Sequence, residues 1–226
     1  LFRLVGSEMC IRDSIRTPKD FRKPCELAVR GLDALLDYQK YPVLAAEIST
    51  NNRRPLGIGI INFAYWLAKN DTNYSDPDLE LVDEWAEAWS YYLIKASNEL
   101  AKEKGACPKS LETRYGNGVV PSDTRKTDVD ELVKHKERRK WKELRKSLKE
   151  HGIRNSTLMA LMPAETSAQI SNSTNGIEPP RSMVSVKQSK HGVLKQVVPG
   201  IHKLKNKYEL LSVSYTHLRA HETEEN

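Results

Sequence analysis

Residues 152–180 read GIRNSTLMALMPAETSAQISNSTNGIEPP, and this stretch decides the fold. Gly152 suits the left-handed conformation that commonly ends a helix. Ser156–Met162 is a short apolar run bounded by a proline, which is typical of a buried strand. The small polar residues that follow lead into Ala168-Gln169-Ile170, where a helix is expected to start. The stretch therefore predicts a strand, a tight turn and a helix.

The turn between this strand and this helix is a candidate anion site. Backbone N–H groups converge at a helix N-terminus, and the helix dipole favours negative charge there. Thr166 and Ser167 add hydroxyls that can cap the helix or donate to a phosphate. A capped helix without a ligand fits the same residues, so the pattern alone leaves both interpretations open. The candidate residues are Pro163, Ala164, Glu165, Thr166 and Ser167.

Several segments of the chain resemble the large (alpha) subunit of class I ribonucleoside-diphosphate reductase. They are RPLGIGIINFAYWLA (54–68), NELAKEKGACP (98–108), Trp141 and Leu144 with GIRN (152–155), Ala160, and PAETSAQISNSTNGIEPPR (163–181). The last of these is similar to the family almost residue for residue. The resemblance covers about Phe21–Leu211 in the family's order. Several long matches in one order are far more specific than a single motif.

The resemblance implies a fold and an activity. The family's large subunit is an α/β barrel of ten strands in two antiparallel halves, with helices outside. This chain would be a helix-rich and incomplete C-terminal part of that barrel. The family reduces ribonucleoside diphosphates to 2′-deoxyribonucleoside diphosphates by a radical mechanism. The family residues that match Pro163–Ser167 bind the substrate diphosphate, which agrees with the anion site predicted from the turn.

The resemblance also implies partners, and machinery that this chain is expected to lack. In the family a radical reaches a finger-loop cysteine from an iron-containing small subunit, and thioredoxin or glutaredoxin re-reduces a cysteine pair. A second large subunit associates, and ATP and deoxynucleotides bind at sites nearer the N-terminus. Cys25 and Cys107 match no catalytic position, and the finger-loop pattern Asn-Leu-Cys-Leu-Glu does not occur. We therefore expect a fragment that binds substrate without turnover and holds no catalytic residue and no cofactor.

The two ends of the chain do not resemble the family. Residues 1–14 (LFRLVGSEMCIRDS) and 212–226 (SVSYTHLRAHETEEN) look like translated adapter sequence, and disorder is expected over 1–14. The barrel part is then expected at 15–211. Genuine but divergent termini are the alternative. His217 and His221 lie four residues apart, but without a third ligand they predict no metal site.

The composition fits a soluble, cytoplasmic protein. The 226 residues suffice for one sizeable domain or a piece of a larger one, and 38% of them are hydrophobic while 29% are charged. No apolar run reaches the length of a membrane span, and the start lacks the order of a signal peptide. The three cysteines show neither metal spacing nor a disulfide framework, which fits a reducing compartment.

The net charge of +6 keeps an alternative class in view, a basic α/β module that binds nucleic acid or a structural module without catalysis. Positive charge gathers at 135–140 (HKERRK), just before Trp141. Both signs are interspersed around that run, which is typical of a solvated helix face. Nucleic-acid binding through Arg138, Arg139 and Lys140 would call for interleaved exposed aromatics or a second basic element, so we do not expect it.

The remaining pattern predicts the elements around the central stretch. Helices are expected at 24–40, 63–69, 78–104 and from 201 to 211, a strand or turn at 56–61, and a hairpin that joins 182–187 to 193–198. In the first helix Ala28, Leu32, Leu35 and Leu36 form the apolar face, whereas Arg30, Asp33 and Asp37 fall elsewhere. Cys25, in its first turn, is interpreted as a packing residue.

Overall fold

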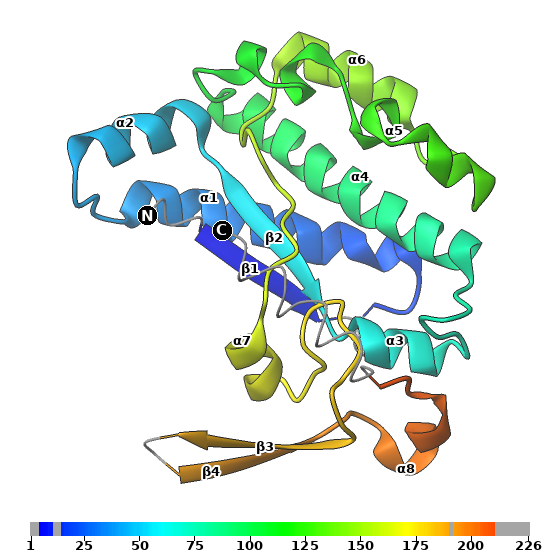
Figure 1. The fold of residues 1–226 in the computed structure, drawn as a ribbon. Coiled ribbons are helices and arrows are strands. Elements are labelled where there is room, and N and C mark those ends of the chain that lie inside the picture. Colours follow the sequence, from blue (N-terminus) through cyan, green and yellow to red (C-terminus); the bar gives the residue numbers. More distant parts are fainter. Residues whose placement is uncertain (1–4, 11–14, 190–191, 211–226) are drawn as a thin grey trace, which may run out of the picture. The chain divides into compact units, whose positions relative to one another are not determined.

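The computed structural model describes residues 5–10, 15–189 and 192–210. Its helices and strands are labelled in Figure 1. The chain divides into two compact units. Of the described residues, the first unit contains 5–9, 15–59 and 79–160, and the second contains 10, 60–78, 161–189 and 192–210. In the described part of the chain, no helix is both long enough and apolar enough to cross a membrane.

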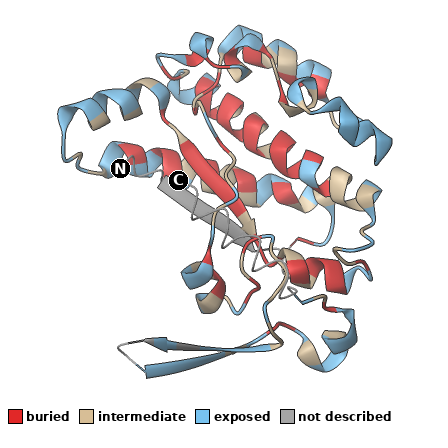
Figure 2. Cartoon of the chain, viewed as in Figure 1, coloured by how far each residue is buried: buried red, intermediate tan, exposed pale blue. Residues whose placement is uncertain are grey.

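The core of the first unit is built from long helices. Helix α4 (Leu79–Lys104) packs along α1 (Arg22–Tyr38) and also against α6 (Trp141–His151). Because α4 is covered from more than one side, buried residues run along most of its length, as Figure 2 shows. The helix that the sequence predicts at 78–104 is therefore confirmed. Gly105 follows α4 with a φ of +84°, and Gly152 follows α6 with a φ of +71°.

The buried stripe of α1 differs from the predicted one. Its buried residues are Cys25, Val29, Leu32, Asp33 and Leu36. Leu35, which the pattern places on the apolar face, is 47% exposed. Asp33, which the pattern places toward solvent, is fully buried. The reason is electrostatic, because buried partners from distant parts of the chain hold the Asp33 carboxylate.

Strand β2 (Leu56–Ile61) follows α2 (Leu44–Arg53) and is buried along nearly its whole length. It pairs with β1 (Val5–Cys10) in a two-stranded sheet. The first fourteen residues, for which disorder is expected, thus contain a strand. A strand beside β2 occupies backbone N–H and C=O groups that an open sheet edge would leave unpaired.

The predicted strand at 156–162 is present only in part. This segment runs parallel to β2 and forms one bridge, between Ile58 and Met159. Ile58 N–H donates to the carbonyl of Leu158 at 2.8 Å, and Ala160 N–H donates to the carbonyl of Ile58 at 3.2 Å. Leu158 is buried, but Leu161 is 57% exposed. The backbone hydrogen bonds between this segment and β2 end at Ala160, so Leu161 and Met162 do not continue the pairing.

Short helical turns connect the long elements of the first unit. They are η1 (Pro18–Phe21), η2 (Ser110–Glu112), η3 (Tyr115–Asn117), α5 (Pro121–Thr124) and η4 (Thr127–Glu131). The stretch between α4 and the basic run at 135–140 is therefore a series of such turns.

The second unit combines short helices with a hairpin. Its elements are α3 (Phe63–Lys69), α7 (Glu165–Ile170), β3 (Val184–Ser189), β4 (Gly192–Val197), α8 (Ile201–Leu204) and η5 (Lys205–Lys207). Strands β3 and β4 pair antiparallel, with Val184 opposite Val197, which confirms the predicted hairpin. The helix predicted from Ile201 ends at Leu204, because the chain turns there and buries Tyr208, whose hydroxyl donates to the carbonyl of Pro199 at 2.7 Å.

Candidate functional site

The predicted anion-binding residues lie together at the start of α7. Ala164 is the N-cap residue of this helix and is buried, whereas Pro163, Glu165 and Thr166 are exposed and Ser167 is partly exposed. The predicted order of extended segment, turn and helix is present, but the helix starts at Glu165 and not at Ala168, so Glu165, Thr166 and Ser167 form its first turn. The first turn of α7 is therefore open to solvent, and its N-cap residue is packed against the protein.

Helix α7 has six residues, and a helix that short is not stable by itself in water. Hydrogen bonds hold it at both ends. The Ala164 N–H donates to Oδ1 of Asn175 at 2.8 Å. At the other end, the Ser171 hydroxyl donates to the carbonyl of Ser167 at 2.8 Å, and Ser173 N–H donates to the carbonyl of Ala168 at 2.8 Å. The loop after the helix thus fixes the helix.

Asn62 attaches that loop to the start of α3. Its side chain is fully buried, and its φ is +71°, a left-handed conformation that asparagine tolerates better than most residues. Asn62 N–H donates to the carbonyl of Thr174 at 2.9 Å, and its Oδ1 accepts the Thr174 N–H at 3.0 Å. Gln196 of β4 donates to the carbonyl of Ser173 at 3.0 Å. The loop is therefore positioned by both α3 and the hairpin.

A cavity of about 350 Å³ lies beside α7 in the same unit. Glu165 and Gln169 line it from the helix, Asn175 from the following loop, and Arg181 and Gln196 from the segment beyond. Polar side chains of both charge signs thus surround this space. Arg181 is exposed and makes no ion pair with a carboxylate that the structure describes.

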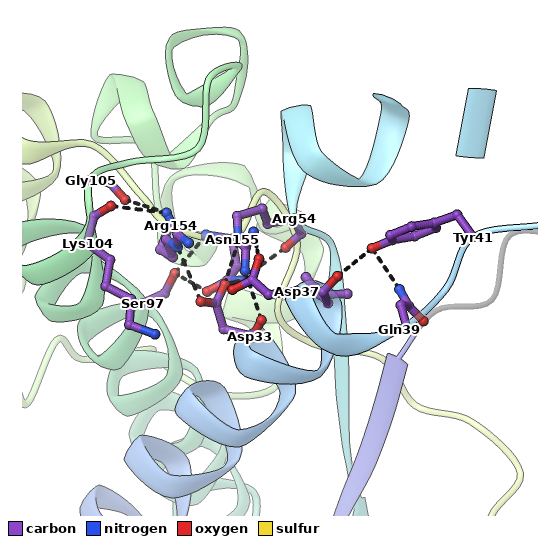
Figure 3. Close-up of polar contacts among 11 residues, drawn as sticks. Asp33, Asp37, Gln39, Tyr41, Arg54, Ser97, Lys104, Gly105, Arg154 and Asn155 are labelled. Carbon is purple, nitrogen blue, oxygen red and sulfur yellow. Dashed lines mark hydrogen bonds and ion pairs between the residues drawn. The ribbon is translucent and has the colours of Figure 1, made fainter. Parts of the chain in front are cut away.

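A buried polar network forms in the first unit (Figure 3). Asp33 accepts hydrogen bonds from Nε of Arg54 at 2.7 Å and from Nδ2 of Asn155 at 3.0 Å. Asn155 Oδ1 in turn accepts from the Ser97 hydroxyl at 2.9 Å, and Arg154 Nε lies 3.3 Å from the other oxygen of Asp33. These contacts join α1, α4, the C-cap residue of α2 and the segment after α6. The network is structural, because its central groups are closed to solvent.

The electrostatics of the network favour the ionised state. Burial acts to lower the pKa of Arg54, but hydrogen bonds to Asp37 and Asp33 outweigh it, so the pKa is raised. The hydrogen bond from Arg54 lowers the pKa of Asp37. Arg54 also has a φ of +45°, a conformation that costs energy for a residue with a side chain. The network therefore stabilises a strained residue directly before β2.

The basic run at 135–140 is paired with carboxylates of α4. Arg138 lies 2.7 Å from Asp83, and Arg139 pairs with the buried Glu87. Glu87 also accepts a hydrogen bond from Nε1 of Trp141 at 2.8 Å. Burial works to raise the pKa of Asp83, but the hydrogen bonds from Arg138 and His135 lower it. This pairing neutralises much of the charge that binding to a phosphate backbone would need.

Cys25 and Cys107 are packing residues. Cys25 and Cys107 are buried and are not in a disulfide. Burial raises the pKa of both thiols, which disfavours the reactive thiolate. Among the described residues no group of His, Cys, Asp and Glu is placed to hold a metal ion. His217 and His221 lie outside the described residues.

Sequence reasoning located the loop but not the residues that hold it. Asn62 and Asn175 both lie in segments with family resemblance, yet the sequence pattern gave neither residue a role of its own. The signal available for Asn62 was an asparagine directly before a helix, a residue type that is enriched at positive φ. Asp33 gave no such signal, because an acid in an amphipathic helix is normally solvated.

Comparison with known proteins agrees with this geometry. The family described as "Ribonucleotide reductase, barrel domain" matches residues 7–222, which supports the predicted fold class of a partial α/β barrel. The matched range extends into both ends that look like adapter sequence.

Curated relatives are large subunits of reductases. The chain is 59% identical over 177 residues to ribonucleoside-diphosphate reductase 1 subunit alpha of Salmonella typhimurium, which covers 78% of this chain and 23% of that protein. It is 58% identical to the subunit alpha of Haemophilus influenzae, with coverage of 81% and 24%. For Enterobacteria phage T4 the identity is 52%, with coverage of 78% and 23%. The chain thus spans about a quarter of the length of these relatives.

Proposed function

This chain belongs to the ribonucleotide reductase barrel-domain family, and from that premise we propose that Pro163–Ser167 bind the diphosphate of a ribonucleoside diphosphate. The observation that carries the proposal is that the first turn of α7 is open to solvent. The N-cap residue before this turn, Ala164, is buried and held by a hydrogen bond. Residues 15–211 would form the part of the barrel domain that presents this turn.

The chemistry of the proposed site is electrostatic. Backbone N–H groups of the first helical turn point toward the N-terminal end of α7, where the helix dipole favours an anion. The Thr166 and Ser167 hydroxyls add donors at the same end. Glu165 brings a negative charge beside the diphosphate, and the backbone donors and the dipole offset that charge. In this arrangement the chain would bind and orient a substrate through its diphosphate.

The reaction of the whole protein is part of the proposal. In the full-length protein the bound ribonucleoside diphosphate would be reduced to the 2′-deoxyribonucleoside diphosphate by a radical mechanism. We expect no turnover by the chain alone, because Cys25 and Cys107 correspond to none of the catalytic cysteines that the family resemblance implies. A second large subunit, a small subunit with iron and thioredoxin or glutaredoxin would be the partners. This chain would bind no cofactor, and ATP and deoxynucleotide effectors would bind at sites outside it. The protein would be cytoplasmic.

Titration of the 226-residue chain with ADP, followed by isothermal calorimetry, tests the proposal. We expect saturable binding that adenosine does not reproduce. Ser167→Glu should abolish it, because the new carboxylate occupies the region of the diphosphate. Ile170→Glu is the matched control, since it adds the same charge at the far end of α7, where Ile170 is 84% exposed. Equal loss in both variants, or equal binding of adenosine, would show that the loop does not bind a diphosphate.

A further inference from the structure

A second cavity, of about 550 Å³, lies in the first unit and has no part in the proposed function. Segments from different parts of the chain form its walls. The first wall is the end of α2 with Pro55, the second is the turn-rich segment 113–124, and the third is the extended segment 156–159. A cavity of this volume is within the range of small-molecule sites in proteins.

Main-chain hydrogen bonds join the first and third walls. Ser156 N–H donates to the carbonyl of Arg53 at 2.9 Å, and Leu56 N–H donates to the carbonyl of Thr157 at 3.0 Å. The Thr157 hydroxyl donates to the carbonyl of Leu56 at 3.1 Å. The cavity is therefore bounded on this side by backbone that is already paired, and a ligand would not have to order it.

The second wall is fixed by a close backbone approach. A Cβ atom on Gly116 would lie 2.1 Å from the carbonyl oxygen of Ser110, so this position requires glycine. The Thr113 hydroxyl donates to that same carbonyl at 2.6 Å and accepts the Gly116 N–H at 2.9 Å. Further along, Arg145 of α6 lies 2.8 Å from Asp123, whose carboxylate also accepts the Val120 N–H. The wall is thus rigid at both ends.

The cavity is lined by both cationic and apolar side chains. Arg53 and Arg114 supply guanidinium groups. Arg53 is paired with the half-exposed Glu112 at 2.7 Å, whereas Arg114 is exposed and makes no ion pair with any carboxylate in the described ranges. The rest of the surface includes Tyr115, whose pKa burial raises, so the phenol stays neutral. Val119, Val120 and Leu158 add apolar surface.

We propose that this cavity binds a small organic anion, a ring or short apolar body that carries one phosphate or carboxylate group. Arg114 is the charge partner of the anionic group, with Arg53 beside it, because a guanidinium can donate two parallel hydrogen bonds to either group. The apolar body packs on Tyr115, Val119 and Leu158. The proposal does not depend on the diphosphate loop, which belongs to the other unit.

The test uses simple probes and the 226-residue chain. Phenyl phosphate and benzoate carry both a ring and an anion, whereas inorganic phosphate lacks the ring and phenol lacks the anion. Binding is followed by chemical-shift changes in ¹H–¹⁵N spectra. We expect at least one of the two ring anions to bind more tightly than both inorganic phosphate and phenol. Which of the two binds more tightly identifies the preferred anionic group.

Substitutions localise the binding. Arg114→Ala should weaken binding of the tighter ring anion by about tenfold or more, because a hydrogen bond to a charged group is lost. Arg22→Ala removes the same charge from an exposed position on α1 and should leave the affinity unchanged. Arg114→Lys keeps the charge without the planar fork, so an intermediate loss is expected. Because Arg114 is exposed, these variants should fold, which thermal unfolding verifies.

Three results would each overturn the proposal. The first is equal weakening by Arg114→Ala and Arg22→Ala, which would indicate unspecific attraction. The second is phenol binding as tightly as the ring anions, which would remove the anionic group from the recognition. The third is the absence of saturable binding of both ring anions. Ser167→Glu should not alter binding of the ring anions, so failure of this proposal and failure of the diphosphate site remain distinguishable.

Discussion

The network around Asp33 in the first unit and the loop around Ala164 in the second are both held by asparagine side chains, but only the first is closed to solvent. Asp33 and Asn155 are fully buried, and their polar groups bond to one another. The loop has a buried Ala164, followed by the exposed Glu165 and Thr166. The hydrogen bonds of the closed network stabilise the fold alone, whereas those of the open loop also hold exposed groups in place for a ligand.

Removing the Asp33 carboxylate should have the largest effect. Asp33→Ala leaves the Arg54 guanidinium buried without its main partner, and breaking a buried pair in this way costs about 3–5 kcal/mol. Urea unfolding of the two proteins measures the change. The control is Glu99→Ala, which breaks a surface pair with Lys102 at 3.1 Å and should cost about 0–1 kcal/mol. Equal small losses of unfolding free energy in both variants would mean that the buried network stabilises the fold no more than a surface ion pair does.

Asn62→Ala should have the second-largest effect on stability, because it removes a buried side-chain amide that holds the loop around Ala164. The Thr174 N–H would lose its acceptor, and an unsatisfied buried donor costs about 1–3 kcal/mol. In Asn62→Gly the glycine adopts the positive φ without strain but has no side-chain amide. This variant should therefore recover only the part of the stability loss that comes from backbone strain. Thermal unfolding gives the ranking. A glycine variant as stable as the wild type would show that the side-chain bond is unimportant.

Asn175→Ala should separate stability from binding. The substitution removes the acceptor of the Ala164 N–H in a part-buried hydrogen bond, so we expect a stability loss of about 0.5–1.5 kcal/mol. The affinity for ADP should fall, because the first turn of α7 loses its anchor. Calorimetric titration and urea unfolding on the same samples measure both. If affinity stays unchanged while stability falls, the loop does not depend on preorganisation.

The smallest expected effect is a pH dependence at the edge of the closed network. Hydrogen bonding from Arg54 lowers the pKa of Asp37 below its ordinary 3.8. The stabilisation is therefore fully present above pH 3.8 and is lost as the pH falls through the lower value of the folded state. Because Asp37 is 53% exposed, we expect only about 0.2–1 kcal/mol.

Unfolding midpoints of the wild type and Asp37→Asn test that pH dependence. The wild type should be the more stable protein at neutral pH, and the difference should shrink as the solution is acidified through the carboxyl range. A difference that grows on acidification would have the wrong sign for a lowered pKa.

Local periodicity was sufficient to predict most of the helices and the hairpin. Phe63–Lys69 has the predicted bounds, and α4 begins one residue after its predicted start. Long-range contacts were beyond this reasoning. Asp33 meets Arg54 across 21 positions and Asn155 across 122, so nothing near Asp33 in the sequence signals that it is buried.

The same limit applies to the site. The five loop residues were identified through the turn pattern and the family resemblance, and the structure places them together at the start of α7. The contact between Asn62 and Thr174 spans 112 positions, so the loop's support was not visible in its own neighbourhood. The predicted strand before the loop failed in its second half for a related reason, because pairing depends on what lies alongside it.

The buried thiols of Cys25 and Cys107 can serve as probes of local unfolding in the first unit. A maleimide reacts with an accessible thiolate, so alkylation at these positions has to wait until the surrounding structure parts. Cys25 lies on α1, and Cys107 lies in the connection after α4. The ratio of their alkylation rates would therefore tell whether this unit opens as a whole or frays from one side.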